Sequence, residues 1–329
     1  MNTGEDELVA KIAKTLSQGS GRRSAYRRGL ALGVGDDAAL LIPKPGYETI
    51  PTCDWFLEGS HFQRHRHPAD SIGWKCLARA VSDIAAMGGS PTYFLLSLGL
   101  PKTHTGRWLD QFLGGLRRAS RQFDCQLAGG DTTRNAKILI NVTVLGEVRQ
   151  GRAVLRSGAR AGDLLFVSGR LGEAELGLQR VRRGQTGRRD PYVNKHLYPE
   201  PRLALGRWLA EEGIATAMMD LSDGLSTDLA RLCAASGVGA KVEADKIPKP
   251  NLSVAKTRSQ RDLTDLALNG GDDYELLFTV MARGARRVPS NFKGVPLVQI
   301  GELTRERRLA LISPGGRKER LVARGWDPF

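Results

Sequence analysis

The sequence predicts a mixed α/β protein with two domains. Segments rich in β-branched and apolar residues alternate with segments whose apolar residues recur at helical spacing. This alternation occurs twice, on either side of the polar stretch GRAVLRSGARAGD that begins at Gly151. The length of 329 residues allows two hydrophobic cores of typical size. We therefore predict one α/β domain over residues 1–150 and a second over residues 151–329.

The first half is predicted to begin with a helix and a mobile arm, within residues 1 to about 25. A helix is predicted over 69–87, where Ile72, Leu77, Val81 and Ile84 recur at helical spacing, and another over 106–123. Segments bounded by Gly or Pro and rich in apolar residues predict strands. These strands cover 37–43, 48–57, 92–100 and 138–148.

In the second half, helices are predicted over 171–183, over 200–212 with Pro201 in its first turn, and over GLSTDLARLCAAS with its end at Gly237. The segment RRGQTGRRDPYVN is expected to be an exposed flexible loop. Strands are predicted for LLFVSG, AKVEA, YELLFTV, PLVQIGEL and LALIS.

Composition indicates a soluble cytoplasmic protein. The longest apolar runs fall well short of the roughly 20 residues that span a bilayer, and MNTGEDELVA does not resemble a signal peptide. The four cysteines form no CxxC pair, so neither a zinc site nor a disulfide framework is predicted. Cys76, Cys125 and Cys233 are expected to be small buried residues, whereas the role of Cys53, next to Asp54, stays open.

The formal net charge of +14 is compatible with nucleic acid, an acidic membrane surface or anionic small molecules. The arginines cluster in GRRSAYRRG, RVRRGQTGRRD and RERR, which have the composition of solvated loops. No basic stripe with interleaved aromatic residues accompanies them. Nucleic acid is therefore an unlikely partner.

Aspartate beside glycine is the recurring motif of this chain. Aspartate is a hard oxygen ligand suited to Mg²⁺, and glycine allows a phosphate to approach the main chain. Each such stretch alone is more typical of a surface turn. As a set, they predict a site for several metal ions and a polyphosphate. The aspartates are Asp36 and Asp37 in GDDAA, Asp54 in TCDWF, Asp83 in VSDIAAMGG, Asp131 in LAGGDTTRN, Asp220 and Asp223 in DLSDG, and Asp272 and Asp273 in GGDDYE.

Three local expectations follow. Asp36 and Asp37 on a strand would point to opposite faces, so only one should enter a shared site. Ser222 is a natural N-cap, which would place the aspartates of DLSDG beside the positive end of a helix. Asp54 and Asp83 lie in apolar segments, where a carboxylate without a cation would be costly.

The sequence contains no GxxxxGK[ST], no HRD with DFG and no GxGxxG that opens a helix. These absences argue against a P-loop enzyme, a protein kinase and a dinucleotide-binding fold. No GxSxG or HExxH motif suggests hydrolase chemistry either. Carboxylates acting through several metal ions are therefore the predicted means of binding phosphates.

In order and spacing, the stretches GVGDDAALL, DWFLEGSHF, SDIAAMGGSP, LAGGDTTR, LRSGARAGD, MDLSDGLSTDL and NGGDDYELLF closely resemble the thiamine-monophosphate kinase family. The resemblance runs from about Gly33 to Gly301. It implies an aminoimidazole ribotide synthetase-like two-domain fold, with an N-terminal domain that dimerises through its sheet and binds ATP and several Mg²⁺. The C-terminal domain would complete the nucleotide and substrate site. The implied reaction is direct in-line phosphorylation of thiamine monophosphate by ATP, with no phosphoenzyme and no covalent catalytic residue.

The resemblance also implies residue roles. Arg156 would bind ATP phosphate as a fork of donors. Trp326, near the C-terminus, could stack on the thiamine rings or merely anchor the tail. The other implied positions are Asp37, Thr52, Cys53, Asp54, Asp83, Asp131, Asp220 and Asp223 for metal; Gly130, Asp131 and Ser222 for ATP; and His61 and Asp272 for substrate.

Several positions depart from the family pattern or keep an alternative reading. Cys53 stands where Thr is usual and Asp272 where Glu is common, while His61 is equally consistent with a structural histidine. Further departures are Ala80, Ala323 and Pro328. The tryptophans expected to pack in a core or between helices are Trp55, Trp74, Trp108 and Trp208. The alternative functions are a sister ATP-using enzyme with another acceptor and a protein that binds nucleotides or nucleic acid.

Overall fold

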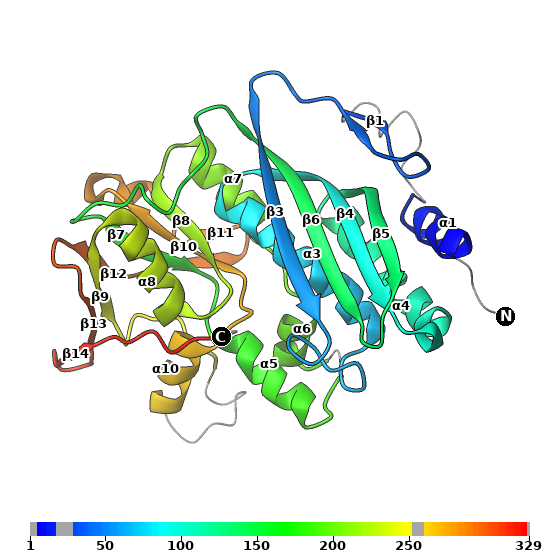
Figure 1. Cartoon of the computed structure of the whole chain (residues 1–329). Helices are drawn as coiled ribbons and strands as arrows, with labels where there is room; N and C mark the ends of the chain where they lie inside the picture. The colour runs from blue at the N-terminus through cyan, green and yellow to red at the C-terminus, as the bar shows by residue number, and fades with distance from the viewer. Residues whose placement is uncertain (1–4, 18–28, 188, 252–259, 328–329) are drawn as a thin grey trace. The chain divides into compact units, whose positions relative to one another are not determined.

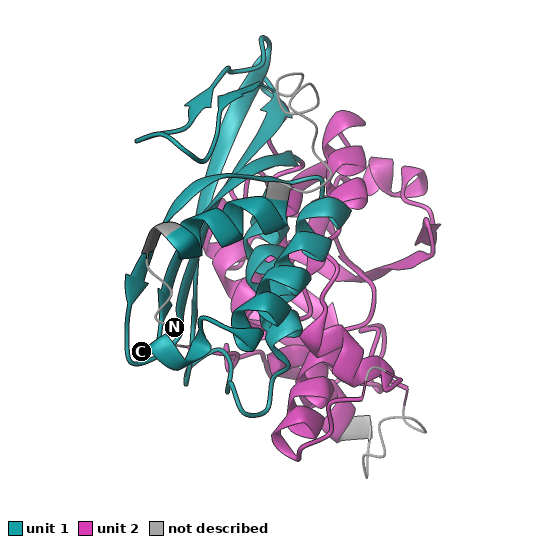
Figure 2. Ribbon diagram, turned by 90° about the vertical axis from the view of Figure 1, so that its right-hand side faces the viewer, with its two compact units in different colours: residues 1–84, 89–151 teal, residues 85–88, 152–329 magenta. Residues whose placement is uncertain are grey.

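The computed structural model describes residues 5–17, 29–187, 189–251 and 260–327. The chain divides into two compact units: Met1–Ile84 with Gly89–Gly151 (unit 1), and Ala85–Gly88 with Arg152–Phe329 (unit 2), shown in Figure 2. Each unit combines a sheet with helices, which confirms the predicted mixed α/β fold (Figure 1). No helix among these residues is long and apolar enough to cross a membrane.

Unit 1 is built on a four-stranded sheet in the order β3-β6-β4-β5, in which only β4 and β5 are parallel. A small hairpin, β1 with β2, is separate from it. The elements are α1 (Glu5–Ser17), β1 (Leu30–Leu32), β2 (Leu40–Leu41), β3 (Tyr47–Leu57), α3 (Ala69–Ala86), β4 (Ser90–Leu100), η1 (Lys102–His104), α4 (Arg107–Gln122), β5 (Gln126–Arg134) and β6 (Leu139–Arg149).

Helices α3 and α4 cover one face of this sheet, where the core of unit 1 lies (Figure 1). The apolar positions that predicted α3 are confirmed as its buried side, with exposed fractions of 0–1%. Gly146 of β6 lies so close to α3 that an added Cβ would sit 2.7 Å from Ile84. The opposite face of the sheet is only partly covered, since alternate residues of β3, among them Cys53 and Trp55, are exposed.

Unit 2 contains an eight-stranded sheet in the order β14-β13-β9-β12-β7-β10-β8, with β11 beside β12. Only the pair β13 and β9 is parallel. The elements are β7 (Leu164–Ser168), α5 (Glu173–Arg182), α6 (Pro191–Leu197), α7 (Leu203–Glu211), β8 (Ala215–Leu221), α8 (Leu225–Ser236), β9 (Gly239–Glu243), α10 (Gln260–Asn269), β10 (Glu275–Val280), η2 (Ala282–Arg287), β11 (Asn291–Phe292), β12 (Val295–Thr304), β13 (Leu309–Ile312) and β14 (Lys318–Arg320).

Strand β10 lies in the interior of unit 2, and all six of its residues are buried. Apolar side chains on both of its faces pack against β7 and β8 and under the helices. Helix α8 ends at Gly237 in the left-handed conformation (φ +67°), which confirms the predicted C-terminal glycine. Continuous apolar runs of this kind indicate strands buried on both faces.

Three sequence predictions differ from the structure. Of residues 37–43 only Leu40–Leu41 form a strand, which is exposed because it pairs only with short β1. The expected loop RRGQTGRRDPYVN ends inside α6, where the Asp190 carboxylate accepts hydrogen bonds from the first turn and Pro191 opens the helix. The helix predicted over 200–212 begins later, at Leu203, since Arg202 occupies the N-cap.

The tryptophan and cysteine predictions are mostly confirmed. Trp74 contacts Phe123, Trp108 stacks on Phe112 and Trp208 stacks on Phe292. Trp55 was predicted wrongly, because its side chain is 55% exposed on the uncovered face of the sheet. The free cysteines Cys76, Cys125 and Cys233 are buried, and burial raises the pKa of all three thiols. The predicted N-terminal helix is α1, whereas the predicted mobile arm lies largely in residues 18–28, outside the described residues.

Candidate functional site

Thr52 and Asp54 place two predicted metal ligands on the α3-facing side of β3. The Thr52 hydroxyl donates a hydrogen bond of 2.5 Å to a carboxylate oxygen of Asp83, on α3. Asp54, two residues further along the strand, lies 4.0 Å from the guanidinium of Arg79, also on α3. Period-two alternation puts the Thr52 hydroxyl and the Asp54 carboxylate on one side of β3, where helix α3 adds the Asp83 carboxylate.

The Cys53 side chain projects to the other face of β3. It is exposed, and its Sγ accepts a hydrogen bond of 3.1 Å from the side-chain amide of Asn141. The thiol therefore cannot join Thr52 and Asp54, whatever residue the family usually has here. Any contribution of Cys53 on the α3-facing side comes from its main chain.

Gly130 and Asp131 lie on strand β5, so the interpretation of LAGGDTTRN as a turn is wrong. Gly130 has φ +155°, and a Cβ at this position would lie 2.0 Å from the Leu96 carbonyl oxygen. A parallel neighbour strand passes here at close range, which explains the glycine better than a turn does.

Asp131 is exposed and belongs to a row across the sheet with Ser97, Asn141 and Trp55. This row lies on the face away from α3, the same face as the Cys53 thiol. Within one chain, Asp54 and Asp131 therefore project from opposite faces of the sheet. Sequence reasoning grouped them and had no signal for this separation, because it depends on the register of β5.

The remaining predicted residues of unit 1 are Asp37 and His61. Asp36 and Asp37 are exposed, the first in an isolated bridge with Val34 and the second in a bend, so the expected alternation along a strand does not apply. The Asp37 N–H donates to the Asp36 carboxylate. His61 Nδ1 accepts the Leu57 N–H at 3.0 Å. The proton of the neutral ring is then on Nε2, which can donate to an acceptor such as a phosphate oxygen.

In unit 2, the DLSDG segment forms the turn between β8 and α8. The helix begins at Leu225 after Gly224, so the prediction that Ser222 is the N-cap is wrong. Asp228, inside the helix, provides the acceptor instead. Its Oδ2 accepts the N–H groups of Ser222, Asp223 and Gly224 at 3.0–3.1 Å.

Arg231 completes this arrangement, because its guanidinium donates to the carboxylates of both Asp223 and Asp228. Burial, with the neighbouring Asp223 charge, raises the pKa of Asp228 to about 6. Sequence reasoning missed Asp228, although an aspartate one turn into a helix that follows a glycine turn is a usable signal. Its carboxylate fixes the backbone that carries Ser222 and Asp223.

Replacing Asp228 with alanine should lower the free energy of unfolding by about 2–4 kcal/mol, since three N–H groups lose their acceptor in a mostly buried place. Activity should fall as well, because Ser222 and Asp223 lose their fixed backbone. Thermal denaturation and kcat/KM measure the two effects. Asp265→Ala, on α10, is the control and should behave like wild type.

The loop Gly270–Tyr274 is hydrogen-bonded to the end of β8. The Asp272 N–H donates to the Ser222 carbonyl at 2.8 Å, and the Tyr274 N–H donates to the Leu221 carbonyl at 2.9 Å. The motifs DLSDG and GGDDYE, about 50 residues apart in the sequence, are thus joined through their main chains. This pairing brings the predicted ATP residue Ser222 next to the predicted substrate residue Asp272.

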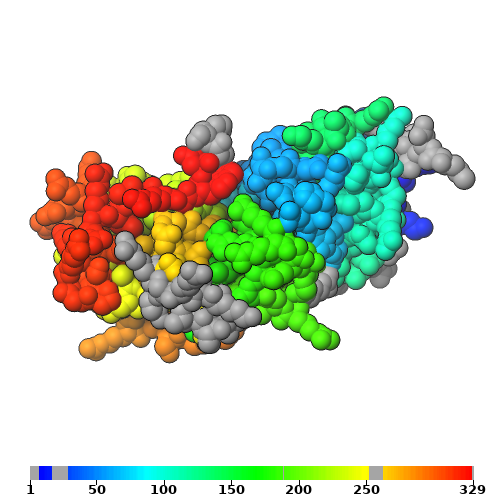
Figure 3. Space-filling model, turned by 90° about the horizontal axis from the view of Figure 1, so that it is seen from below, coloured from blue at the N-terminus to red at the C-terminus, as the bar shows by residue number. Residues whose placement is uncertain are grey.

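Arg156 and Trp326 contact opposite ends of helix α8. Arg156 is exposed in the loop before β7. The main-chain carbonyl of Arg156 accepts the Ser236 hydroxyl at 2.6 Å. The C-terminal segment lies at the surface (Figure 3) and is hydrogen-bonded to Ser226 and Thr227 in the first turn of α8. The Trp326 N–H donates to the Asp223 carbonyl at 3.0 Å. The Trp326 side chain is 44% exposed, so its backbone is anchored while much of its ring is accessible.

Asp220 is buried (3% exposed) at the end of β8, beside the neighbouring strand β10. Among the described residues, no group of three or more His, Cys, Asp or Glu side chains is arranged to hold a metal ion. The side chains predicted to bind metal nevertheless suit Mg²⁺, since their ligand atoms are carboxylate oxygens and the Thr52 hydroxyl. The carboxylates are distributed over both units.

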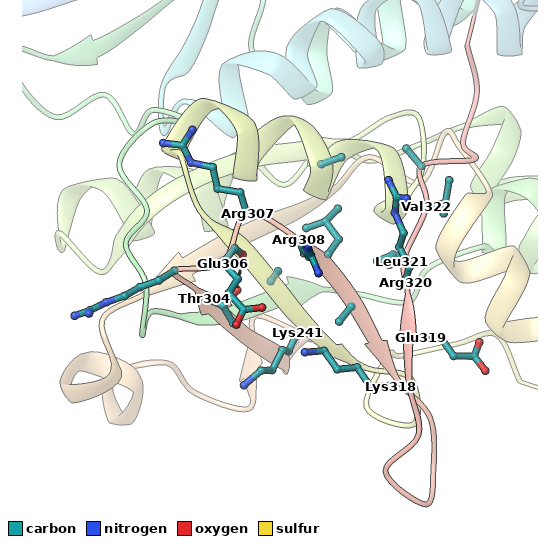
Figure 4. Close-up of a pocket in the computed structure, with 16 residues that line it drawn as sticks. Lys241, Thr304, Glu306, Arg307, Arg308, Lys318, Glu319, Arg320, Leu321 and Val322 are labelled. Carbon is teal, nitrogen blue, oxygen red and sulfur yellow. Dashed lines mark hydrogen bonds between the residues drawn. The ribbon is translucent and has the colours of Figure 1, made fainter.

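A basic pocket of about 1140 Å³ lies at the edge of the unit 2 sheet. Figure 4 shows the labelled side chains around it, which come from β9, the end of β12, the turn before β13, and β14 with the two residues after it. None of the residues predicted for metal, ATP or substrate lines this pocket. Its basic residues are Lys241, Arg305, Arg307, Arg308, Lys318 and Arg320.

The fold of the two units identifies the class of protein to which the chain belongs. Residues 35–148 match the family model for the N-terminal domain of AIR synthase related proteins, and residues 160–313 match the model for their C-terminal domain. Structures of the hydrogenase maturation protein HypE share the fold at 21% identity, with a TM-score of 0.74 over 91% of this chain and 96% of that chain. The protein is therefore of the two-domain AIR synthase-related class.

Closer relatives place it within that class. Thiamine-monophosphate kinase of Salmonella typhimurium is 37% identical over 311 residues, which cover 92% of this chain and 91% of the relative. The Escherichia coli (strain K12) enzyme of the same name is 35% identical over 336 residues, covering 100% and 99%. The chain belongs to the thiamine-monophosphate kinase family.

Solved structures agree with this assignment. Thiamine-monophosphate kinase from Stenotrophomonas maltophilia K279a matches with a TM-score of 0.80 and 35% identity, over 92% of this chain and 95% of that chain. The structure of AaThiL complexed with AMPPCP and TMP matches with a TM-score of 0.77 and 30% identity, over 99% and 97%.

Proposed function

We propose that this protein phosphorylates thiamine monophosphate with ATP, giving thiamine diphosphate and ADP. The observation that carries the proposal is the AaThiL complex with AMPPCP and TMP, which matches this chain over 99% of its length. The joined motifs DLSDG and GGDDYE support it, because they bring a predicted ATP residue beside a predicted substrate residue. The proposed site of action is the cytoplasm.

We propose for each site residue the role that the sequence predicted. Residues 1–150 would bind ATP and Mg²⁺, and residues 151–329 would complete the nucleotide and substrate site. Arg156 is exposed and offers a fork of donors to phosphate oxygens. Mg²⁺ at Asp37, Thr52, Asp54, Asp83, Asp131, Asp220 and Asp223, with the Cys53 main chain, would neutralise charge on the phosphates.

The acceptor phosphate of thiamine monophosphate is already ionised at neutral pH, so no strong general base is required. One of its oxygens forms a bond to the γ-phosphorus of ATP while the bond from that phosphorus to ADP breaks. The part of the protein is to bind, orient and exclude water, which is the main requirement of phosphoryl transfer. His61 Nε2–H would donate to the substrate phosphate, and Trp326 would stack on the thiamine rings.

A homodimer formed through the uncovered face of the unit 1 sheet is part of the proposal. Trp55 on this face is 55% exposed, and tryptophan is enriched at protein–protein interfaces, so this face is a candidate interface. Asp131 and the Cys53 thiol lie on the same face. A second copy would cover these residues, and Trp55→Lys should convert the dimer to monomers in light scattering.

Two variants test the proposed function. Asp54→Asn and Asp131→Asn should abolish formation of thiamine diphosphate while leaving the fold intact, because each removes one charge and keeps the shape. A panel of phosphate and carboxylate acceptors, followed by ADP release, identifies a sister enzyme with another acceptor. ADP release with a different acceptor and none with thiamine monophosphate would contradict the proposal.

Substitutions in the basic pocket test the alternative that this protein binds nucleic acid. Six Lys and Arg residues line this pocket against two glutamates, Glu306 and Glu319, which favours anions at this surface. A nucleic-acid-binding protein would show salt-sensitive binding of RNA or DNA. That binding would weaken in Arg308→Gln/Arg320→Gln and persist in the aspartate variants. We expect no such binding at physiological ionic strength.

A further inference from the structure

The carboxylate of Asp272 is contacted by two buried side chains, one at each oxygen. The Tyr274 hydroxyl donates to Oδ1 at 2.8 Å, and Nδ1 of His196 lies 3.7 Å from Oδ2. Tyr274 is 2% exposed and His196 is 1% exposed, whereas the Asp272 side chain is 26% exposed. A partly open carboxylate is thus backed by groups that solvent does not reach.

The backbone around Asp272 is in a costly conformation. Asp272 (φ +67°) and Tyr274 (φ +50°) both occupy the left-handed region that non-glycine residues rarely adopt. Each such residue costs about 1 kcal/mol or more and persists where the surroundings fix it. Conformations of this kind are concentrated at functional sites.

The surroundings do fix this loop. Main-chain hydrogen bonds tie Asp272 and Tyr274 to Ser222 and Leu221. Between them, the buried carboxylate of Asp273 accepts the N–H groups of Gly172 and Ala174, at the start of α5, at 2.5 and 3.0 Å. Asp273 therefore points away from Asp272, into the protein, and holds the loop from behind.

His196 reaches Asp272 from a separate helix. Helix α6 packs closely against α5, where a Cβ on Gly177 would lie 2.0 Å from the Tyr192 carbonyl oxygen. This close packing fixes where α6, and with it His196, stands. Three elements, namely α6, the 270–274 loop and the end of β8, thus fix the position of one carboxylate.

We propose that Tyr274 and His196 are positioning residues for the substrate. They hold the Asp272 carboxylate in one orientation, so that it can accept an N–H of the amino group on the aminopyrimidine ring of thiamine monophosphate. This inference rests on the proposed function and on the substrate role of Asp272. The short side chain makes the orientation important, because aspartate reaches one methylene less than the glutamate common in the family.

Tyr274→Phe tests the proposal, since it removes only the hydroxyl that donates to Asp272. We expect KM for thiamine monophosphate to rise about tenfold, as for the loss of one hydrogen bond to a charged group. KM for ATP and the melting temperature should stay close to wild type. His196→Gln should raise the same KM. Tyr192→Phe is the matched control, because this buried hydroxyl donates to the Asn251 carbonyl and should leave all three values unchanged.

A double-mutant cycle separates positioning from general support of the fold. In the Asp272→Asn background, Tyr274→Phe should add little to KM, because its partner charge is already gone. Equal effects in both backgrounds, or a wild-type KM in Tyr274→Phe, would refute the positioning role while the kinase activity stands. If the wild-type protein itself does not phosphorylate thiamine monophosphate, the proposed function fails first and this inference fails with it.

Discussion

Asp83→Asn should lower kcat/KM for thiamine monophosphate by roughly a thousandfold, the upper range for the loss of one electrostatic group at a catalytic site. Asparagine keeps the size of the side chain and an oxygen that can accept the Thr52 hydroxyl. What it removes is the negative charge on the α3-facing side of β3. Initial rates at saturating Mg²⁺ and ATP measure the effect.

Asp70→Asn is the control for this prediction. Asp70 lies in the first turn of the same helix and pairs with Arg118 at 2.7 Å, in a partly exposed position. Its replacement should change kcat/KM by less than about twofold, as for a surface ion pair. An Asp83→Asn protein with a normal melting temperature and nearly normal activity would show that this carboxylate has no part in the reaction.

Glu275→Gln should be the most destabilising single change of a polar residue in unit 2. The Glu275 side chain is fully buried and accepts hydrogen bonds from Lys195, Arg202 and Ser168 at 2.5–2.6 Å. Glutamine leaves two largely buried cations without their counter-charge, at a cost of about 3–5 kcal/mol. Calorimetry should show a melting temperature lower by about 10 °C.

The Glu275 carboxylate also sets part of the pH dependence of the free energy of unfolding. Burial alone would raise its pKa, but the charges and hydrogen bonds of Lys195 and Arg202 outweigh burial and hold the pKa of Glu275 at about 2. A lowered pKa means that this group stabilises the fold above about pH 4.5 and that the contribution is lost as pH falls toward 2. The stability difference between wild type and Glu275→Gln should therefore shrink over that range.

Glu302→Gln provides the comparison. Glu302 pairs with Lys241 at 3.0 Å, and both side chains are about half exposed. Its loss should cost at most about 1 kcal/mol. If Glu275→Gln is no more destabilising than this variant, the buried ion cluster does not stabilise unit 2 as described.

Periodic apolar segments were predictable from the sequence, and isolated or polar ones were not. Helix α3 and strands β3, β4 and β6 match their predictions because buried apolar faces dominate them. Strand β5 was missed because its two glycines and its polar end suggest a turn, while the reason for the glycine at position 130 is the nearby carbonyl of Leu96. A contact of this kind depends on tertiary structure.

The candidate site shows the same limit. The DLSDG and GGDDYE motifs were found in the sequence and were grouped with the other aspartate stretches into one predicted site. The acceptor that holds the first of them, Asp228, and the side chains behind Asp272 were not found. These residues act through hydrogen bonds between distant segments, for which a single sequence carries no periodic signal.

Transfer of label from [γ-³²P]ATP shows whether the protein moves the γ-phosphate directly to thiamine monophosphate. With purified protein, Mg²⁺ and thiamine monophosphate, we expect the label to appear in the terminal phosphate of thiamine diphosphate, in amounts equal to the ADP formed. No labelled protein should be trapped by rapid acid quench, because the transfer is direct. Label found only in inorganic phosphate, or on the protein before it reaches the product, would show that direct transfer to thiamine monophosphate does not occur.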